Sequence, residues 1–153
     1  MNDTLISIAY LAASAARLAV NLDDKLMVLG IYILEGGSRK PVEAVRPGKK
    51  YRMITYYKVL APITNEWEGF IHIDGHHRRH NGDHKPMDGK YPFSYWLEGD
   101  TMVDDHEFSL EPNFTPGSYT IYFGLFVGDT RFKVKSGPSD GDNRIVGGVL
   151  VVQ

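Results

Sequence analysis

Hydrophobic and polar positions follow two different periods along this chain, and the change comes near residue 24. In residues 4–20 apolar side chains recur every three or four positions, which predicts an α-helix. After residue 24 apolar residues alternate singly with polar ones or form short continuous runs, as they do in β-strands. The pattern therefore predicts an apolar N-terminal helix in residues 1–22 and a separate β-domain in residues 25–153.

Turn residues divide the second part of the chain at short intervals. Pro47-Gly48 and Pro116-Gly117 precede two apolar runs, and Gly128-Asp129 predicts a hairpin, while residues 75–99 are expected to form a long loop. The β-branched and aromatic runs that we interpret as strands are residues 25–34, 49–59, 67–74, 102–110, 118–127, 130–134 and 145–152. Seven or eight strands with no second helical pattern predict an all-β fold, an antiparallel immunoglobulin-like β-sandwich.

The apolar helix expected in residues 1–22 has three interpretations. A signal peptide would carry a basic segment before its apolar core, and this one does not. A membrane span is short here, because a bilayer core of about 30 Å needs about 20 apolar residues and alanine adds little insertion energy. We favour a docking or membrane-proximal helix that packs on its own domain or on a neighbouring subunit.

Composition narrows the class of protein. The chain has 153 residues, 42% of them apolar and 24% charged, which is typical of one soluble globular domain. The formal charge of −2 gives no basic surplus for a nucleic acid. The absence of cysteine excludes disulfides and thiolate metal centres, and no phosphate loop, HExxH or GxSxG motif occurs. We therefore expect no enzyme activity and no cofactor.

An ordered series of short pieces marks the β-domain. These pieces are FIHIDG (70–75), GDHKP (82–86), YPFSYWLEGD (91–100), Asp104, PGSYTIYFGLF (116–126) and Arg131-Phe132. In this order they resemble a bacterial β-sandwich module that follows membrane glycosyltransferases of the dolichyl-phosphate-mannose type and also occurs in exported proteins. The resemblance covers about residues 45–152 and implies an accessory immunoglobulin-like domain in an extracytoplasmic setting, without an established activity.

The sequence departs from that module in a loop that is rich in histidine and arginine. Imidazole and carboxylate groups can bind zinc, nickel or copper, and the spacing of these histidines would align them on a helix. Glycine, asparagine and proline instead favour a loop, and Arg78 and Arg79 oppose a cation. We therefore assign no metal site and keep a solvated loop as the alternative. The residues that a metal would use are His76, His80, Asp83 and His84.

Two further groups of residues could bind a ligand. The first group consists of carboxylates between residues 98 and 142. Calcium would need six to eight oxygen ligands, and these carboxylates form no complete calcium-loop pattern. No two of them stand out as a pair for glycoside hydrolysis. Aromatic rings could stack on a sugar, with packing of the tryptophan in the core as the alternative. The carboxylates are Glu98, Asp100, Asp104, Asp105, Glu107, Asp140 and Asp142, and the rings are Tyr91, Tyr95 and Trp96.

These features favour a non-catalytic accessory or structural subunit. We expect it to join a protein partner or a second copy of itself through the N-terminal helix or a sheet edge. The expected location is periplasmic, extracellular or membrane-associated. A carbohydrate-binding module that uses Tyr91, Tyr95 and Trp96 is the alternative, and a metal-binding histidine loop is another.

Overall fold

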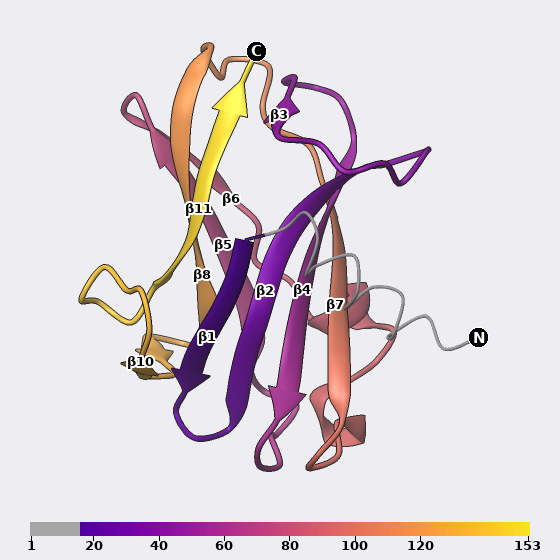
Figure 1. Ribbon diagram of the computed structural model, residues 1–153, viewed down its shortest axis with the longest axis vertical. Helices are drawn as coiled ribbons and strands as arrows, with labels where there is room; N and C mark the ends of the chain where they lie inside the picture. The colour runs from indigo at the N-terminus through magenta and orange to yellow at the C-terminus, as the bar shows by residue number, and fades with distance from the viewer. Residues whose placement is uncertain (1–15) are drawn as a thin grey trace.

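The computed structural model of the protein describes residues 16–153, and its strands form two sheets that pack face to face (Figure 1). The five-stranded sheet contains, in spatial order, β10 (Val134–Ser136), β1 (Ala16–Leu22), β2 (Leu26–Glu35), β4 (Tyr51–Val59) and β7 (Thr101–Phe108). The six-stranded sheet contains β3 (Ala44–Val45), β11 (Ile145–Val152), β8 (Gly117–Val127), β5 (Glu68–Gly75) and β6 (Arg78–Asn81), with β9 (Thr130–Arg131) beside β8. Two short 3-10 helices, η1 (Pro86–Gly89) and η2 (Phe93–Tyr95), lie between β6 and β7.

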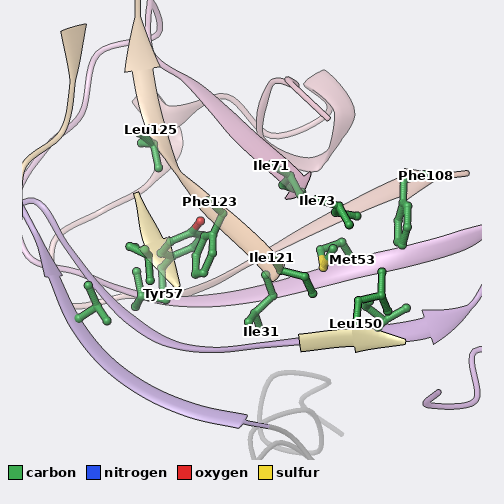
Figure 2. Close-up of a cluster of buried hydrophobic side chains, with 14 of the residues drawn as sticks. Ile31, Met53, Tyr57, Ile71, Ile73, Phe108, Ile121, Phe123, Leu125 and Leu150 are labelled. Atoms are coloured by element: carbon green, nitrogen blue, oxygen red, sulfur yellow. The ribbon is translucent and has the colours of Figure 1, made fainter. Parts of the chain in front are cut away.

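The strand pairs are antiparallel, except that β3 runs parallel to β11. Alternate residues of each long strand point into the space between the sheets, as the two-residue period of a strand requires. Figure 2 shows such side chains from both sheets meeting, among them Met53 of β4, Ile73 of β5, and Ile121 and Phe123 of β8. The architecture is a β-sandwich with one main hydrophobic core.

β2 is buried on both of its faces. Its continuous apolar run fits either a strand buried on both faces or a strand at a sheet edge, and the structure places β2 between β1 and β4 inside the five-stranded sheet. One face joins the main core, and the other carries a smaller cluster of Leu34, Ile54 and Tyr56. The hydroxyl oxygens of Tyr32 and Tyr56 lie 3.0 Å apart beside that cluster.

The long strands confirm the all-β prediction, and the predicted number of strands is wrong. Within residues 16–153 there are eleven strands rather than seven or eight. The difference comes mainly from short strands of two to four residues, which are too brief to show a period. One of them, β6, falls inside the predicted loop of residues 75–99 and pairs with β5.

The helix prediction is wrong for residues 16–22, which form β1, and residues 1–15 lie outside the described part of the chain. β1 and β2 form a hairpin whose turn residues, Asp23 and Asp24, have φ angles of 52° and 57°. Asn21 fixes this turn, because its side-chain oxygen accepts a hydrogen bond from the Asp24 amide at 2.8 Å. Val20 and Leu22 are fully buried in the core, so tertiary packing outweighs helix propensity.

No helix within residues 16–153 has the length and hydropathy that a membrane crossing requires. Whether residues 1–22 dock as a unit separate from residues 25–153 stays a prediction.

Candidate functional site

A hollow of about 480 Å³ opens on the outer face of the six-stranded sheet, away from the main core. We call it the outer-sheet hollow. Its floor is formed by β5 and β8, and its walls come from the segment after β6, the β8–β9 turn and the turn before β11. The residues that line it are Phe70, His72, Asp83, Phe126, Gly128, Asp129, Arg131, Asp142 and Asn143.

The alternation along β5 places two of these side chains in the hollow. Ile71 and Ile73 point inward to the core, so Phe70 and His72 point outward. β8 supplies the neighbouring floor residue Phe126, whose ring lies 6.2 Å from that of Phe70 in an edge-on arrangement. The sequence therefore sets the floor through its period of two.

The Phe70 ring is held tightly although it lies outside the main core. Only 2% of Phe70 is exposed, because the guanidinium of Arg131 lies over the ring, 4.9 Å from its centre. Gly124 leaves room for the ring beneath it, since a Cβ atom there would lie 2.8 Å from Cε2 of Phe70. Arg131 is fixed in turn by a 2.9 Å hydrogen bond to the backbone oxygen of Asp142.

A second arginine ties the turn before β11 to the floor of the hollow. Arg144 donates to Oδ2 of Asp140 at 2.6 Å and to Oδ2 of Asp74 at 3.1 Å, and it stacks over Tyr122 at 3.9 Å. It also lies 3.1 Å from Nδ1 of His72. An arginine can only donate, so Nδ1 of His72 accepts and the ring carries its proton on Nε2.

The charges in the hollow are unbalanced. Asp83, Asp129 and Asp142 line it together with a single guanidinium, that of Arg131. His72 adds no positive charge at neutral pH, because burial, together with the nearby arginines, lowers its pKa to about 4. Burial and the charge of Glu68 raise the pKa of Asp83 above its usual value. A neutral polar ligand or a cationic one fits this charge pattern better than an anionic ligand.

A different polar group joins the two sheets at their β6–β7 side. The rings of His84 and His106 stack with their centres 3.8 Å apart, and we call them the imidazole pair. Nε2 of His84 lies 2.6 Å from Oδ2 of Asp104, and its Nδ1 lies 2.7 Å from the backbone oxygen of Gly82. Nδ1 of His106 lies 2.7 Å from Oδ1 of Asp88. Because both nitrogens of His84 face acceptors, this ring is the one that carries two protons.

The pKa values of the imidazole pair shift in opposite directions. Burial alone would lower the pKa of His84, but the hydrogen bond and charge of Asp104 outweigh it and raise that pKa above 6.5. Burial and the positive charge of His84 lower the pKa of His106 below 6.5, against the effect of Asp88. One proton is thus favoured on the pair and a second one is opposed.

The backbone beside the imidazole pair is strained. Met87 and Asp88 have φ angles of 53° and 52°, in the left-handed region that residues other than glycine seldom adopt. Asp104 stabilises this turn, since its second carboxylate oxygen accepts a hydrogen bond from the Met87 amide at 2.8 Å. The pair therefore connects η1, β7 and the segment after β6.

The metal candidates of the histidine-rich loop do not converge. His80 and His84 point inward from one extended segment, with Cα atoms about 13 Å apart by strand geometry, while Asp83 between them points outward into the hollow. His76 lies at the β5–β6 turn and packs on Tyr119, with ring centres 4.9 Å apart. No group of three or more metal-binding side chains occurs in residues 16–153.

The candidate sugar platform is also divided. Trp96 is only 2% exposed and packs on Tyr57 and Phe93 with ring centres 5.7 and 4.8 Å away. Tyr91 and Tyr95 are exposed and meet edge to face, so their rings present no shared flat surface. The tryptophan packs in the core, as the alternative interpretation expects.

Several of the candidate carboxylates form ion pairs within the fold. Asp104 pairs with His84, Asp105 with Arg39 and Arg52, and Asp140 with Arg144. Of the whole group, Asp142 alone lines the outer-sheet hollow.

Comparisons with known proteins bear on the fold and leave the ligand open. The sequence matches no protein-family model, and no curated protein is significantly similar to it. The structure is similar to a Niemann-Pick type C2 protein from the Japanese carpenter ant, with a TM-score of 0.50 and 10% identity over 92% of this chain and 96% of that one. It is also similar to the C-terminal domain of Wzt, with a TM-score of 0.56 and 14% identity over 95% of this chain and 84% of that one.

At these identities the likenesses show the fold alone. They agree with an all-β domain and are consistent with an immunoglobulin-like sandwich. The closer resemblance to a module that follows glycosyltransferases stays a prediction.

Sequence reasoning did not identify the outer-sheet hollow as a site. The alternation in residues 67–74 puts Phe70 and His72 on one face of the strand, and Gly128-Asp129 correctly predicted a hairpin. The missing information was that this turn and the one at residues 139–143 rise over the same face. Arg131 and Asp142 meet across 11 positions of sequence, and no local period reports such a contact.

Proposed function

We propose that the protein is a non-catalytic binding domain that holds a neutral or amino-bearing glycan in the outer-sheet hollow. The observation that carries this proposal is the lining of the hollow, in which three carboxylates and one guanidinium surround a floor that includes the half-buried ring of Phe126. Sugars offer hydroxyl groups to such planar polar side chains and apolar C–H groups to rings. This proposal assigns glycan binding to the residues of the outer-sheet hollow and not to Tyr91, Tyr95 and Trp96.

Arg131 and the turn before β11 are positioned before any ligand arrives. Arg131 is fixed by Phe70 and Asp142, and the turn before β11 is fixed by Arg144. Side chains that are already ordered lose little entropy on binding, so a shallow polar site can still bind with useful affinity. The excess of carboxylates disfavours uronic acids and phosphorylated sugars.

The test is a binding measurement on a glycan array, followed by titration calorimetry with the best neutral oligosaccharide. Asp83→Asn combined with Asp142→Asn is expected to weaken binding about tenfold or more, because hydrogen bonds to charged groups are lost. The matched control, Glu66→Gln combined with Glu98→Gln, changes two exposed carboxylates outside the hollow and should leave binding intact. Equal loss in both variants, or selective binding of acidic glycans, would contradict the proposal.

Protein assembly is a second candidate function, and the outer side of β11 favours it. β11 pairs with β8 along its length, whereas β3 covers only Val151 and Val152 on the other side. Val149 and Val151 are 67% and 41% exposed. An uncovered edge with exposed apolar side chains can pair with a second copy of the chain. Val149→Lys should then lower the mass measured by light scattering, and a wild-type monomer at high concentration would exclude this assembly.

A further inference from the structure

The extended segment that follows β6 connects the imidazole pair to the outer-sheet hollow. The amides of Gly82 and His84 donate to the backbone oxygens of Ile71 and Gly69 at 2.8 and 2.9 Å, so the segment continues the edge of the six-stranded sheet. Successive side chains of an extended segment point to opposite faces. Asp83 therefore lies in the hollow while its neighbour His84 points between the sheets to Asp104.

We propose that the imidazole pair is a pH-dependent clamp that holds Asp83 in the outer-sheet hollow, so that acidification loosens this wall and weakens ligand binding. The regulation of binding rests on the proposed function, whereas the clamp itself can be measured without any ligand. The juxtaposition that carries the inference is the stack of His84 on His106 directly behind Asp83.

The clamp works because the stack tolerates one positive charge. With His84 doubly protonated and His106 neutral, one cation lies between two carboxylates, Asp104 and Asp88. A second proton places two cations in rings whose centres are 3.8 Å apart and which are largely shielded from water. Their repulsion is relieved when His84 moves away from β7 and takes Asp83 with it.

Other titratable and charged groups lie close to the imidazole pair. From β6, His80 approaches the same space, since a Cβ atom on Gly82 would lie 3.5 Å from Nε2 of His106 and 3.7 Å from Nε2 of His80. On β4, Arg52 is near enough for the charge of Asp88 to contribute, after Asp105 and Glu107, to the raised pKa of its guanidinium. The positive charge of His84 is felt at Asp83 itself, where it favours the carboxylate.

Local backbone features make the segment a suitable moving part. A Cβ atom on Gly82 would lie 3.3 Å from Cβ of Ile71, and one on Gly69 would lie only 3.2 Å from Cε1 of His84. The strained turn at Met87 and Asp88 is held by contacts from β7, and its strain is released when those contacts open. The side-chain contacts of the clamp thus hold a turn whose backbone is strained.

The test uses the unliganded full chain and follows hydrogen exchange at the amides of Gly82 and His84 from neutral to mildly acidic pH. In the wild type, their protection factors should fall by up to about tenfold per pH unit, because opening is coupled to the uptake of one proton. His106→Gln retains a donor to Asp88 but cannot become a cation, so protection should stay nearly constant. His77→Gln, which changes an exposed imidazole at the β5–β6 turn, should behave as the wild type.

Ligand binding is then measured over the same pH range with the neutral oligosaccharide used above. As the pH falls, affinity should fall in the wild type and in His77→Gln. In His106→Gln it should fall only at lower pH, where His72 and the carboxylates that line the hollow titrate. Equal protection in the wild type and His106→Gln would overturn the clamp. If protection falls while affinity stays constant, the coupling to the hollow is wrong. If no glycan binds at any pH, the proposed function fails and the exchange data still decide the clamp.

Discussion

Gly124→Ala tests whether the floor of the outer-sheet hollow is as closely packed as the structure indicates. The new Cβ atom would lie 2.8 Å from Cε2 and 2.9 Å from Cζ of Phe70, which is too close for a real contact. The Phe70 ring cannot move freely, because Arg131 covers it and Phe126 lies beside it. We expect a loss of about 1–3 kcal/mol in the free energy of unfolding, as for other overpacked sites. For a domain of this size that corresponds to a fall of about 3–10 °C in Tm.

A double-mutant cycle separates this clash from other effects of the substitution. Phe70→Leu alone removes ring area and the contact with Arg131, which contributes about 1 kcal/mol. In the double variant the added methyl meets leucine, which is smaller than phenylalanine. The sum of the two single-variant losses in the free energy of unfolding should therefore exceed the loss measured for the double variant by about 1 kcal/mol. Urea unfolding of the four proteins gives the coupling energy. Strict additivity, or a Gly124→Ala protein as stable as the wild type, would refute the packing argument.

Three further predictions concern other parts of the molecule. Trp96→Ala should cost about 3–5 kcal/mol in urea unfolding, whereas Tyr95→Ala should change stability by about 0.5 kcal/mol or less, because only the tryptophan is buried; equal losses would refute this assignment. His106→Gln should flatten the acid side of the stability profile: burial lowers the pKa of His106 below 6.5, so the wild type loses stability as the pH falls below 6.5, although His72 keeps part of this slope. Parallel profiles of urea midpoints between about pH 7 and pH 5 would exclude a role for His106. His77→Gly should raise the free energy of unfolding by about 0.5 kcal/mol, because φ is 60° at this turn position and glycine adopts that angle without strain. A lower urea midpoint in this variant would contradict backbone strain at His77.

The long strands could be predicted from the sequence because each satisfies its pattern locally. β4, β5 and β8 alternate or carry aromatic and β-branched residues, and Pro-Gly pairs precede β4 and β8. β1 could not be predicted in this way, since its alanines and leucines also suit a helix. Pairing with β2 across the hairpin and with β10, more than 100 positions away, makes it a strand.

The candidate site depended even more on non-local information. The histidine-rich loop was correctly noticed as unusual, but a helical spacing was considered where the chain is extended. In a strand, residues four apart share a face yet lie too far apart to bind one ion, and residues one apart point to opposite faces. That geometry separates Asp83 from His84 and gives them different surroundings. His106 lies 22 positions beyond His84, so its stacking partner could not be read from spacing.

The outer-sheet hollow contains residues that stabilise the fold and other residues that can be varied. Phe70, Tyr122 and their two guanidinium caps belong to the frame, while Asp129 and Asp142 sit on turns that add no side chain to the main core. Turn tips of this kind tolerate replacement and insertion. A library that randomises Asp129 and Asp142 and keeps the caps and Asp140 should therefore yield folded proteins with new ligand preferences, which makes this domain a scaffold for engineered recognition.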